Sequence, residues 1–162
     1  MGTGMSQQNL EKFSIVDYQP SYAEAFRTLN QEWIEAYFRM EDTDEKVLKD
    51  PEGEILAKGG CIQVALLEGE AVGVCALVPH GEDCLELAKM AVAPRARGYG
   101  VGKALGVAVI EKARSLGARR LYLGSNTLLE AAIRLYRSLG FQELEGEVSP
   151  YERCNIQMEL RL

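Results

Sequence analysis

The sequence predicts a mixed α/β fold, in which an antiparallel group of strands is extended by a parallel strand–helix–strand unit. Three apolar runs of strand length, at residues 61–67, 71–78 and 85–92, are separated only by short polar turns. Connections this short join antiparallel strands. A helical pattern at residues 101–116 and an apolar run at residues 120–125 come next. A strand–helix–strand unit of this length places its two strands in parallel.

The amino-terminal segment is expected to supply a first strand and two helices. Residues 12–18 alternate in polarity as a strand does. A helix is predicted over residues 21–29, and a second amphipathic segment over residues 30–38. The acidic stretch at residues 40–60 is expected to be a loop with one helical turn near residues 44–48.

The carboxyl-terminal half is assigned from helix signals. The helix at residues 101–116 is expected to bury five apolar side chains: Val101, Leu105, Val109, Ala113 and Leu116. Gly117 ends this helix as a C-terminal glycine cap. A capping-box pattern at residues 127–130 starts a further helix, and residues 141–144 and 156–160 are the last strands. The predicted order is βααβββαβαβ.

Length and composition indicate one domain. The chain has 162 residues, of which 47% are hydrophobic and 26% are charged, and these values are typical of a single globular domain. We assign residues 1–162 to this domain, with the polar residues 1–11 as a frayed tail. No apolar run reaches the length of a membrane span and no secretory leader is visible. We therefore expect a cytoplasmic protein without a membrane partner.

Charge and cysteine usage argue against several other classes. The net charge is −6, whereas binding to the phosphate backbone of a nucleic acid requires a basic face. The four cysteines have no CxxC spacing and the chain has one histidine. Neither a metal site nor a disulfide scaffold is therefore predicted, and free thiols are expected.

A glycine-rich turn at residues 97–103 joins the third apolar run to the long helix. Such a turn suits a phosphate, because the first N–H groups of a helix are unpaired and lie at the positive end of the helix dipole. The spacing differs from both common nucleotide motifs. A P-loop would need glycine where Arg97 stands and serine or threonine where Ala104 stands, and a dinucleotide motif counted from Gly98 ends on Lys103.

The turn does match Arg97-x-x-Gly100-x-Gly102, after a strand that ends at Val92. This pattern resembles the acetyl-CoA signature of the GNAT superfamily of N-acetyltransferases, and the element order from residue 12 onward is similar to that of the family. The resemblance implies the acyl-CoA N-acyltransferase fold, with acetyl-CoA as co-substrate and no metal. It implies cofactor contacts from Met90, Ala91, Val92, Arg97, Gly98, Gly100, Val101, Gly102 and Lys103.

The same resemblance implies how the rest of the cofactor would be held. The main chain of residues 90–92 would pair with the pantetheine arm like an added strand, and the Met90 N–H would donate to the thioester oxygen. Asn126 would contact the pantetheine arm. Capping of the following helix is a second role for Asn126, and the two roles are compatible.

Glu86 is the candidate general base. It is the only acid in the apolar run at residues 85–92, where partial desolvation would raise its proton affinity. Its distance from Val92 resembles that of the glutamate base in the histone-acetylating branch of the family. The alternative is a solvent-facing carboxylate, or one that binds a cationic substrate while the proton leaves through water.

Tyr136 is the candidate general acid. Residues 132–141 resemble the family block A-x-x-x-Y-x-x-x-G-F, whose tyrosine lies near the CoA sulfur and can protonate the departing thiolate. Because Tyr136 also falls on the apolar stripe of its helix, a core aromatic is the alternative.

The acceptor site is less well defined by the sequence. Trp33 and Tyr37, with Phe38, lie where the family places a variable substrate wall, although aromatic residues at this spacing also form cores. His80 is expected to be a surface residue in a turn. The acidic segment at residues 41–54 is expected to be solvated, or to attract a cationic amine.

These observations predict an N-acetyltransferase that moves the acetyl group of acetyl-CoA to a primary amine of a small molecule, by direct attack in a ternary complex. Two alternatives are a protein lysine or N-terminal acetyltransferase and a CoA-binding module without turnover. A structural protein would leave the glycine turn unexplained. The sequence is compatible with a homodimer and does not identify the acceptor.

Overall fold

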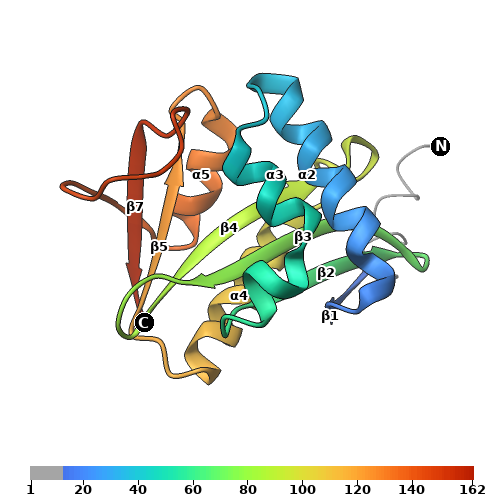
Figure 1. Cartoon of the computed structure of the whole chain (residues 1–162), viewed down its shortest axis with the longest axis horizontal. Coiled ribbons are helices and arrows are strands. Elements are labelled where there is room, and N and C mark those ends of the chain that lie inside the picture. Colours follow the sequence, from blue (N-terminus) through green and yellow to red (C-terminus); the bar gives the residue numbers. More distant parts are fainter. Residues whose placement is uncertain (1–12) are drawn as a thin grey trace.

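The computed structural model describes residues 13–162, which form one seven-stranded sheet with helices on both faces (Figure 1). The expected tail at residues 1–11 and the first residue of the predicted first strand lie outside the described residues. The strands are β1 (Phe13–Asp17), β2 (Cys61–Leu67), β3 (Glu70–Pro79), β4 (Cys84–Val92), β5 (Arg120–Ser125), β6 (Gln142–Leu144) and β7 (Ile156–Arg161). The main helices are α2 (Ala23–Tyr37), α3 (Asp42–Lys49), α4 (Val101–Ser115) and α5 (Glu130–Ser138).

The sheet order is β1-β2-β3-β4-β5-β7-β6, with β4 and β5 parallel and the other pairs antiparallel. The expected mixed α/β fold is therefore confirmed. The predicted order also holds, but its two early helices are α2 and α3, and its last β is formed by the two strands β6 and β7. At the β2–β3 hairpin, Glu68 and Gly69 have φ of 51° and 83°, the pair of positive values that a type I′ turn requires.

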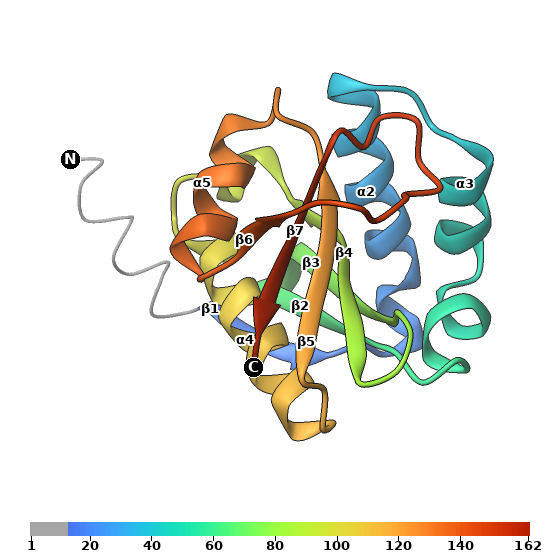
Figure 2. The ribbon, with the colours of Figure 1, turned by 90° about the vertical axis from the view of Figure 1, so that its left-hand side faces the viewer.

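The helices cover the two faces of the sheet and enclose two apolar cores. α4 and α5 pack against one face, around Leu105, Val109 and Leu121, and α2 and α3 pack against the other, around Phe26, Ile34 and Leu48. Figure 2 shows the sheet between these two layers. Within residues 13–162, no helix is both long enough and apolar enough to cross a membrane.

The helices before β2 differ from the prediction. Residues 21–29 and 30–38 are not two segments, because a 3₁₀ turn (Pro20–Tyr22) leads into the single continuous helix α2. The acidic stretch is not mainly a loop, because it contains α3 and a π-helical turn (Glu52–Leu56). α3 begins with a capping box in which Glu41 and Asp44 each accept the backbone N–H of the other, so these acids define a helix start.

Two details of the later helices also differ. α4 buries Val101, Leu105, Val109 and Ala113 as predicted, but Leu116 is 51% exposed because the helix ends at Ser115 and Gly117 turns the chain. The pattern at residues 127–130 is not a capping box. Instead the Asn126 Oδ1 accepts the Leu128 N–H at 2.8 Å, and α5 starts only at Glu130.

β4 contains a bulge that sets the orientation of its side chains. Ala76 of β3 pairs with Ala88 and Val74 pairs with Ala91, so the single residue Cys75 faces two residues of β4, Lys89 and Met90, across the ladder. Lys89 has φ of 54°. Leu87 and Met90 both pack toward the α4 core, so the bulge moves the Lys89 side chain to the α2–α3 face, where Glu86 also lies.

β4 and β5 separate after Glu86, before the bulge. They are paired only at Cys84↔Arg120, Leu85↔Leu121 and Glu86↔Tyr122, although β4 continues to Val92 and β5 to Ser125. From Leu87 onward, the edge of β4 that faces β5 has no ladder partner there. The gap between the two strands is where the candidate site lies.

Candidate active site

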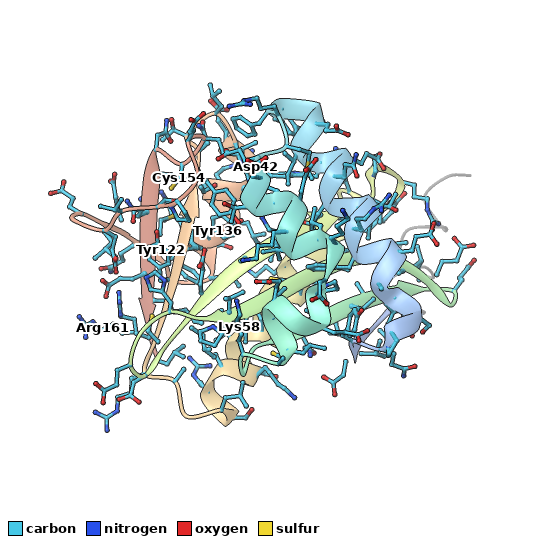
Figure 3. All side chains as sticks on the ribbon, in the orientation of Figure 1. Asp42, Lys58, Tyr122, Tyr136, Cys154 and Arg161 are labelled. Carbon is cyan, nitrogen blue, oxygen red and sulfur yellow. The ribbon has the colours of Figure 1, made fainter. Side chains whose placement is uncertain are left out.

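A cavity of about 100 Å³ opens where β4 and β5 separate. Its walls come from α2, from residues 86–90 of β4, from the end of β5 and from α5. The segment between β6 and β7, residues 145–155, closes one side and is called the β6–β7 loop below. In Figure 2 this loop reaches across toward α2 and α3. In Figure 3 the labelled Tyr122, Tyr136 and Cys154 lie on the side of the molecule where β5 and β7 are found.

Glu86 lines this cavity from β4. Burial raises the pKa of its carboxyl group, and the charges of His80 and Lys89 lower it by less, so the net shift is upward. The His80 Nδ1 is 3.9 Å from the Glu86 Oε1. His80 is not a simple surface residue, because its ring is partly buried and stacks on Tyr122 with ring centroids 4.1 Å apart.

Tyr136 enters the same cavity from α5. Its ring packs edge-on against Phe141 at a centroid distance of 6.1 Å. Tyr136 therefore also contacts the α4 core, as expected for the alternative role of a core aromatic. Burial raises the pKa of its hydroxyl group. The hydroxyl is therefore protonated near neutral pH and can donate a hydrogen bond or a proton.

Asn126 lines the cavity at the end of β5 and is 9% exposed. Besides accepting the Leu128 N–H, it donates from Nδ2 to the Arg153 carbonyl at 2.7 Å, so it joins β5 to the β6–β7 loop. Met90 also lines the cavity, whereas Ala91 is buried in the α2–α3 core and Val92 packs toward α4.

Only part of the predicted aromatic wall lies at the cavity. Trp33 and Phe38 line the cavity. Tyr37 is 54% exposed and lies outside the cavity, with its ring centroid 5.8 Å from that of Trp33.

The glycine turn lies outside the cavity walls, at the start of α4. Gly98 and Gly100 have φ of 85° and 82°, and a Cβ at either position would meet no atom within 4 Å. Gly100 is the N-cap of α4, so the N–H groups of Val101, Gly102 and Lys103 belong to the first helical turn and have no intrahelical acceptor. The Arg97 Nε donates to the Val92 carbonyl at 3.3 Å, which ties the turn to the end of β4.

A buried ionic cluster, which the sequence did not reveal, completes the site. The Asp44 carboxylate is fully buried and accepts hydrogen bonds from Lys89 at 2.5 Å, from Arg153 at 2.7 Å through both oxygens, and from the Glu41 N–H at 3.0 Å. Burial alone would raise the pKa of Asp44, but the Arg153 and Lys89 contacts outweigh it and lower this pKa to about 2. Tyr151 lies against both cations, with its ring centroid 4.5 Å from each.

One signal for this cluster was present in the sequence. Lys89 is the only cation in the apolar run at residues 85–92, and a lysine buried there requires a partner. Arg153 could not be paired with Asp44 in the same way, because 109 residues separate them.

All four cysteines are free thiols, as expected. Among residues 13–162, no group of three His, Cys, Asp or Glu side chains is arranged to hold a metal ion.

Comparison with known proteins agrees with this geometry. The sequence profile described as the acetyltransferase (GNAT) family matches residues 22–141. N-acetylaspartate synthetase of Rattus norvegicus is 39% identical over 106 residues, covering 65% of this chain and 33% of that protein. The uncharacterized N-acetyltransferase YjgM of Escherichia coli is 38% identical over 105 residues, covering 62% of this chain and 63% of that protein. The chain thus spans about a third of the length of the synthetases it matches.

Solved structures share the fold. An acetyltransferase of the GNAT family from Staphylococcus aureus has a TM-score of 0.84 at 22% identity, over 92% of this chain and 98% of that one. The acetyltransferase yncA from Salmonella typhimurium, solved with acetyl-CoA, has a TM-score of 0.74 at 21% identity, over 93% of this chain and 94% of that one. With a family profile that covers most of the sequence and a sheet of the same architecture, the chain belongs to the acetyltransferase (GNAT) family.

Proposed function

We propose that this protein transfers the acetyl group of acetyl-CoA to the primary amine of a small molecule. The observation that carries the proposal is that one cavity, at the point where β4 and β5 separate, brings together the Glu86 carboxylate, residue Met90 and the Tyr136 hydroxyl. These groups come from β4 and α5, and they supply a base, a backbone donor and an acid for acyl transfer.

The residues present fit acetyl-CoA, which supplies the activated acetyl group. The N–H groups of Val101, Gly102 and Lys103, which lack an intrahelical acceptor, and the open space above Gly98 and Gly100 suit a pyrophosphate at a helix start. The edge of β4 that faces β5 beyond Glu86 suits the peptide-like pantetheine arm, which would pair with it as an added strand. Asn126 borders the same space from the other side.

Three groups of the chain would act on the reacting atoms. Glu86 accepts the proton of the ammonium group, directly or through a water molecule. Its raised pKa makes the carboxylate a stronger base. The Met90 N–H donates to the thioester oxygen. Tyr136 donates its proton or a hydrogen bond to the departing thiolate sulfur.

Two observations favour a small amine over a protein substrate. The cavity is narrowed by α2 on one side and by the β6–β7 loop on the other, which leaves little room for a polypeptide. The relatives named N-acetylaspartate synthetase carry the name of an acetylated amino acid, so aspartate belongs in the first set of amines to be tested.

The test combines binding and turnover. Acetyl-CoA binding is measured by isothermal titration calorimetry, and release of the CoA thiol is followed with a thiol reagent across a panel of amino acids, polyamines and lysine peptides. We expect binding together with turnover of at least one small amine. Turnover confined to peptides would favour a protein acetyltransferase, binding without turnover would favour a CoA-binding module, and absence of binding would overturn the proposal.

A further inference from the structure

We propose that the acceptor is an amino acid whose carboxylate is bound by Lys89 and Arg153 while its amine faces Glu86. This inference rests on the proposed function and specifies the substrate class of the same cavity. It is carried by two cations, Lys89 and Arg153, whose side chains are 6% and 16% exposed and form part of the cavity wall.

Lys89 is placed in the cavity by the bulge in β4. A regular strand would direct residue 89 toward the α4 core, because Leu85 and Leu87 point there. The extra residue instead directs Lys89 to the face of Glu86, at the cost of a positive φ of 54°. A lysine in this conformation is uncommon, and such strain is found preferentially where a side chain serves a site. The side chain is 6% exposed and lines the cavity.

Arg153 approaches from the opposite side, on the β6–β7 loop. Its side chain is 16% exposed and also lines the cavity. Arg153 and Lys89 share the Asp44 carboxylate and the Tyr151 ring. These common partners fix the positions of the two cations relative to each other before any ligand binds, and such preorganisation favours affinity.

The acids that balance these cations lie outside the cavity wall. Asp44 is 0% exposed and Glu41 is 13% exposed in their side chains, and neither lines the cavity, whereas both cations do. The hydrogen bonds among the described residues use two of the three Lys89 ammonium protons and three of the five Arg153 N–H groups. Each cation therefore keeps at least one donor beyond its protein partners.

The cavity consequently has two charged ends. Glu86 provides a negative group for the amine, and the Lys89–Arg153 pair provides positive groups for an anion. These ends are close enough for the Lys89 charge to lower the pKa of Glu86. Trp33, Ile34 and Phe38 add an apolar wall from α2. An amine with a carboxylate a few atoms away matches this pattern, whereas a polyamine would place a second cation against Lys89 and Arg153.

The experiment uses matched substrates that differ only in the charge of one group: L-alanine with L-alaninamide, L-aspartate with L-asparagine, and L-glutamate with L-glutamine. We expect kcat/KM to be at least about tenfold higher for the carboxylate in at least one pair, the scale of a charged hydrogen bond. In Lys89→Met this ratio should fall toward one, through a higher KM for the carboxylate member of the pair. Because amine pKa differs within a pair, the change of the ratio between wild type and variant is the decisive quantity.

Two further variants complete the design. Lys46→Met removes an exposed lysine on α3 that faces Glu54, and it should leave the ratio unchanged. Lys89→Arg keeps the charge and should recover part of the preference. Folding of Lys89→Met is judged by circular dichroism and acetyl-CoA affinity. If it does not fold, the inference is tested by the carboxylate-to-carboxamide ratios of kcat/KM for the wild type and for Lys89→Arg.

The outcomes separate this inference from the proposed function. Amine turnover without any preference for the carboxylate members overturns the carboxylate subsite and leaves acetyl transfer standing. An equal loss for both members of every pair in Lys89→Met means that the cluster only supports the fold, and it also overturns the inference. Absence of turnover for every amine overturns both proposals.

Discussion

Two segments next to each other in the sequence place backbone at positive φ, and they do so by different means. In the turn at residues 97–103, Gly98 and Gly100 have φ of 85° and 82° with open space around them. In β4, Lys89 has φ of 54° and is enclosed by Asp44, Tyr151 and Arg153. Glycine adopts such a conformation without help, whereas lysine needs surrounding contacts to offset its strain.

The difference indicates a division of tasks. The glycine turn exposes main-chain N–H groups and leaves room for a ligand, so its proposed contribution is binding by the backbone. The bulge in β4 turns the Lys89 side chain to the face of Glu86, so its contribution is to the wall of the cavity. Substitutions in the two segments should therefore affect different quantities.

The largest effect is expected at the ionic cluster that supports the bulge. Asp44→Asn leaves Lys89 and Arg153 buried without their shared countercharge, and loss of one partner from a buried ion pair costs about 3 kcal/mol or more. Urea unfolding monitored by circular dichroism should show this decrease. Asp42→Asn, at an exposed position of the same helix, is the control and should change the free energy of unfolding little.

The pKa of Asp44 also predicts how its contribution to the free energy of unfolding changes at acid pH. The pKa of Asp44 is about 2 in the folded protein, below its ordinary value of 3.8. Its contribution is therefore present above pH 3.8 and is lost as the pH falls from there toward 2. Asp44→Asn should lose less stability than wild type over this interval. Parallel curves for the two proteins would contradict the assigned ion pairs.

The next largest effect is expected at Glu86, which lies in β4. Glu86→Gln should lower kcat/KM by about a hundredfold at pH 7, the lower part of the range for general base catalysis. The loss should shrink as pH rises, because more of the amine is then already deprotonated. Acetyl-CoA affinity should remain near that of wild type, and Glu143→Gln on the exposed edge strand β6 is the control. A loss that is uniform across pH would assign Glu86 to amine binding instead.

Tyr136→Phe should lower kcat by roughly tenfold or more, with a smaller change in KM for acetyl-CoA, because the proposed role of the hydroxyl is to act on the leaving thiolate. Tyr122→Phe is the comparison for loss of a second tyrosine hydroxyl, since burial also raises the pKa of that hydroxyl and it donates to Gln157 at 2.8 Å, whereas Tyr122 is not among the residues that line the cavity. Steady-state kinetics and thermal unfolding of both variants separate the roles. Wild-type kcat with lowered stability in Tyr136→Phe would favour the core interpretation.

The smallest effect is expected at the glycine turn, and it should appear in binding alone. Gly100→Val places a branched side chain at φ of 82° and in the space that a pyrophosphate would need. Acetyl-CoA affinity should fall about tenfold, or about 1.4 kcal/mol, as measured by calorimetry. Gly117→Val introduces the same strain, at φ of 84° and also in open space, at the other end of α4. Equal losses of affinity in both variants would mean that strain, and not the phosphate site, is responsible.

Much of this arrangement could be predicted from sequence because its signals are local. Apolar runs divided by turns identify β2, β3 and β4, and glycines mark both ends of α4. The motif around Gly100 and the block around Tyr136 indicate the family, and Glu86 is distinctive as an acid in an apolar strand. Each of these signals lies within about ten residues of the feature that it predicts.

The parts that were missed depend on contacts between distant segments. Asp44 resembles a solvated acid until Lys89 and Arg153 are placed beside it, 45 and 109 residues away. The bulge also gives no local signal, since lysine replaces the glycine that usually marks a positive φ. The division of α2 into two predicted segments is a different kind of error, because the helix runs on without a break and the buried Asn30 donates to the Phe26 carbonyl within it.

The bulge can finally be described as a single added residue in an otherwise regular strand. Leu85 and Leu87 before it, and Met90 and Val92 after it, all face the α4 core, so a strand lacking Lys89 would alternate without interruption. The added residue thus decides which face of β4 carries the residue 89 side chain, and without it no cation from β4 would reach the cavity. The number of residues in β4 therefore determines the composition of the cavity wall as much as their identity does. Among homologues with this fold, we expect one-residue gaps at this position to mark proteins in which no cation lines the cavity from β4.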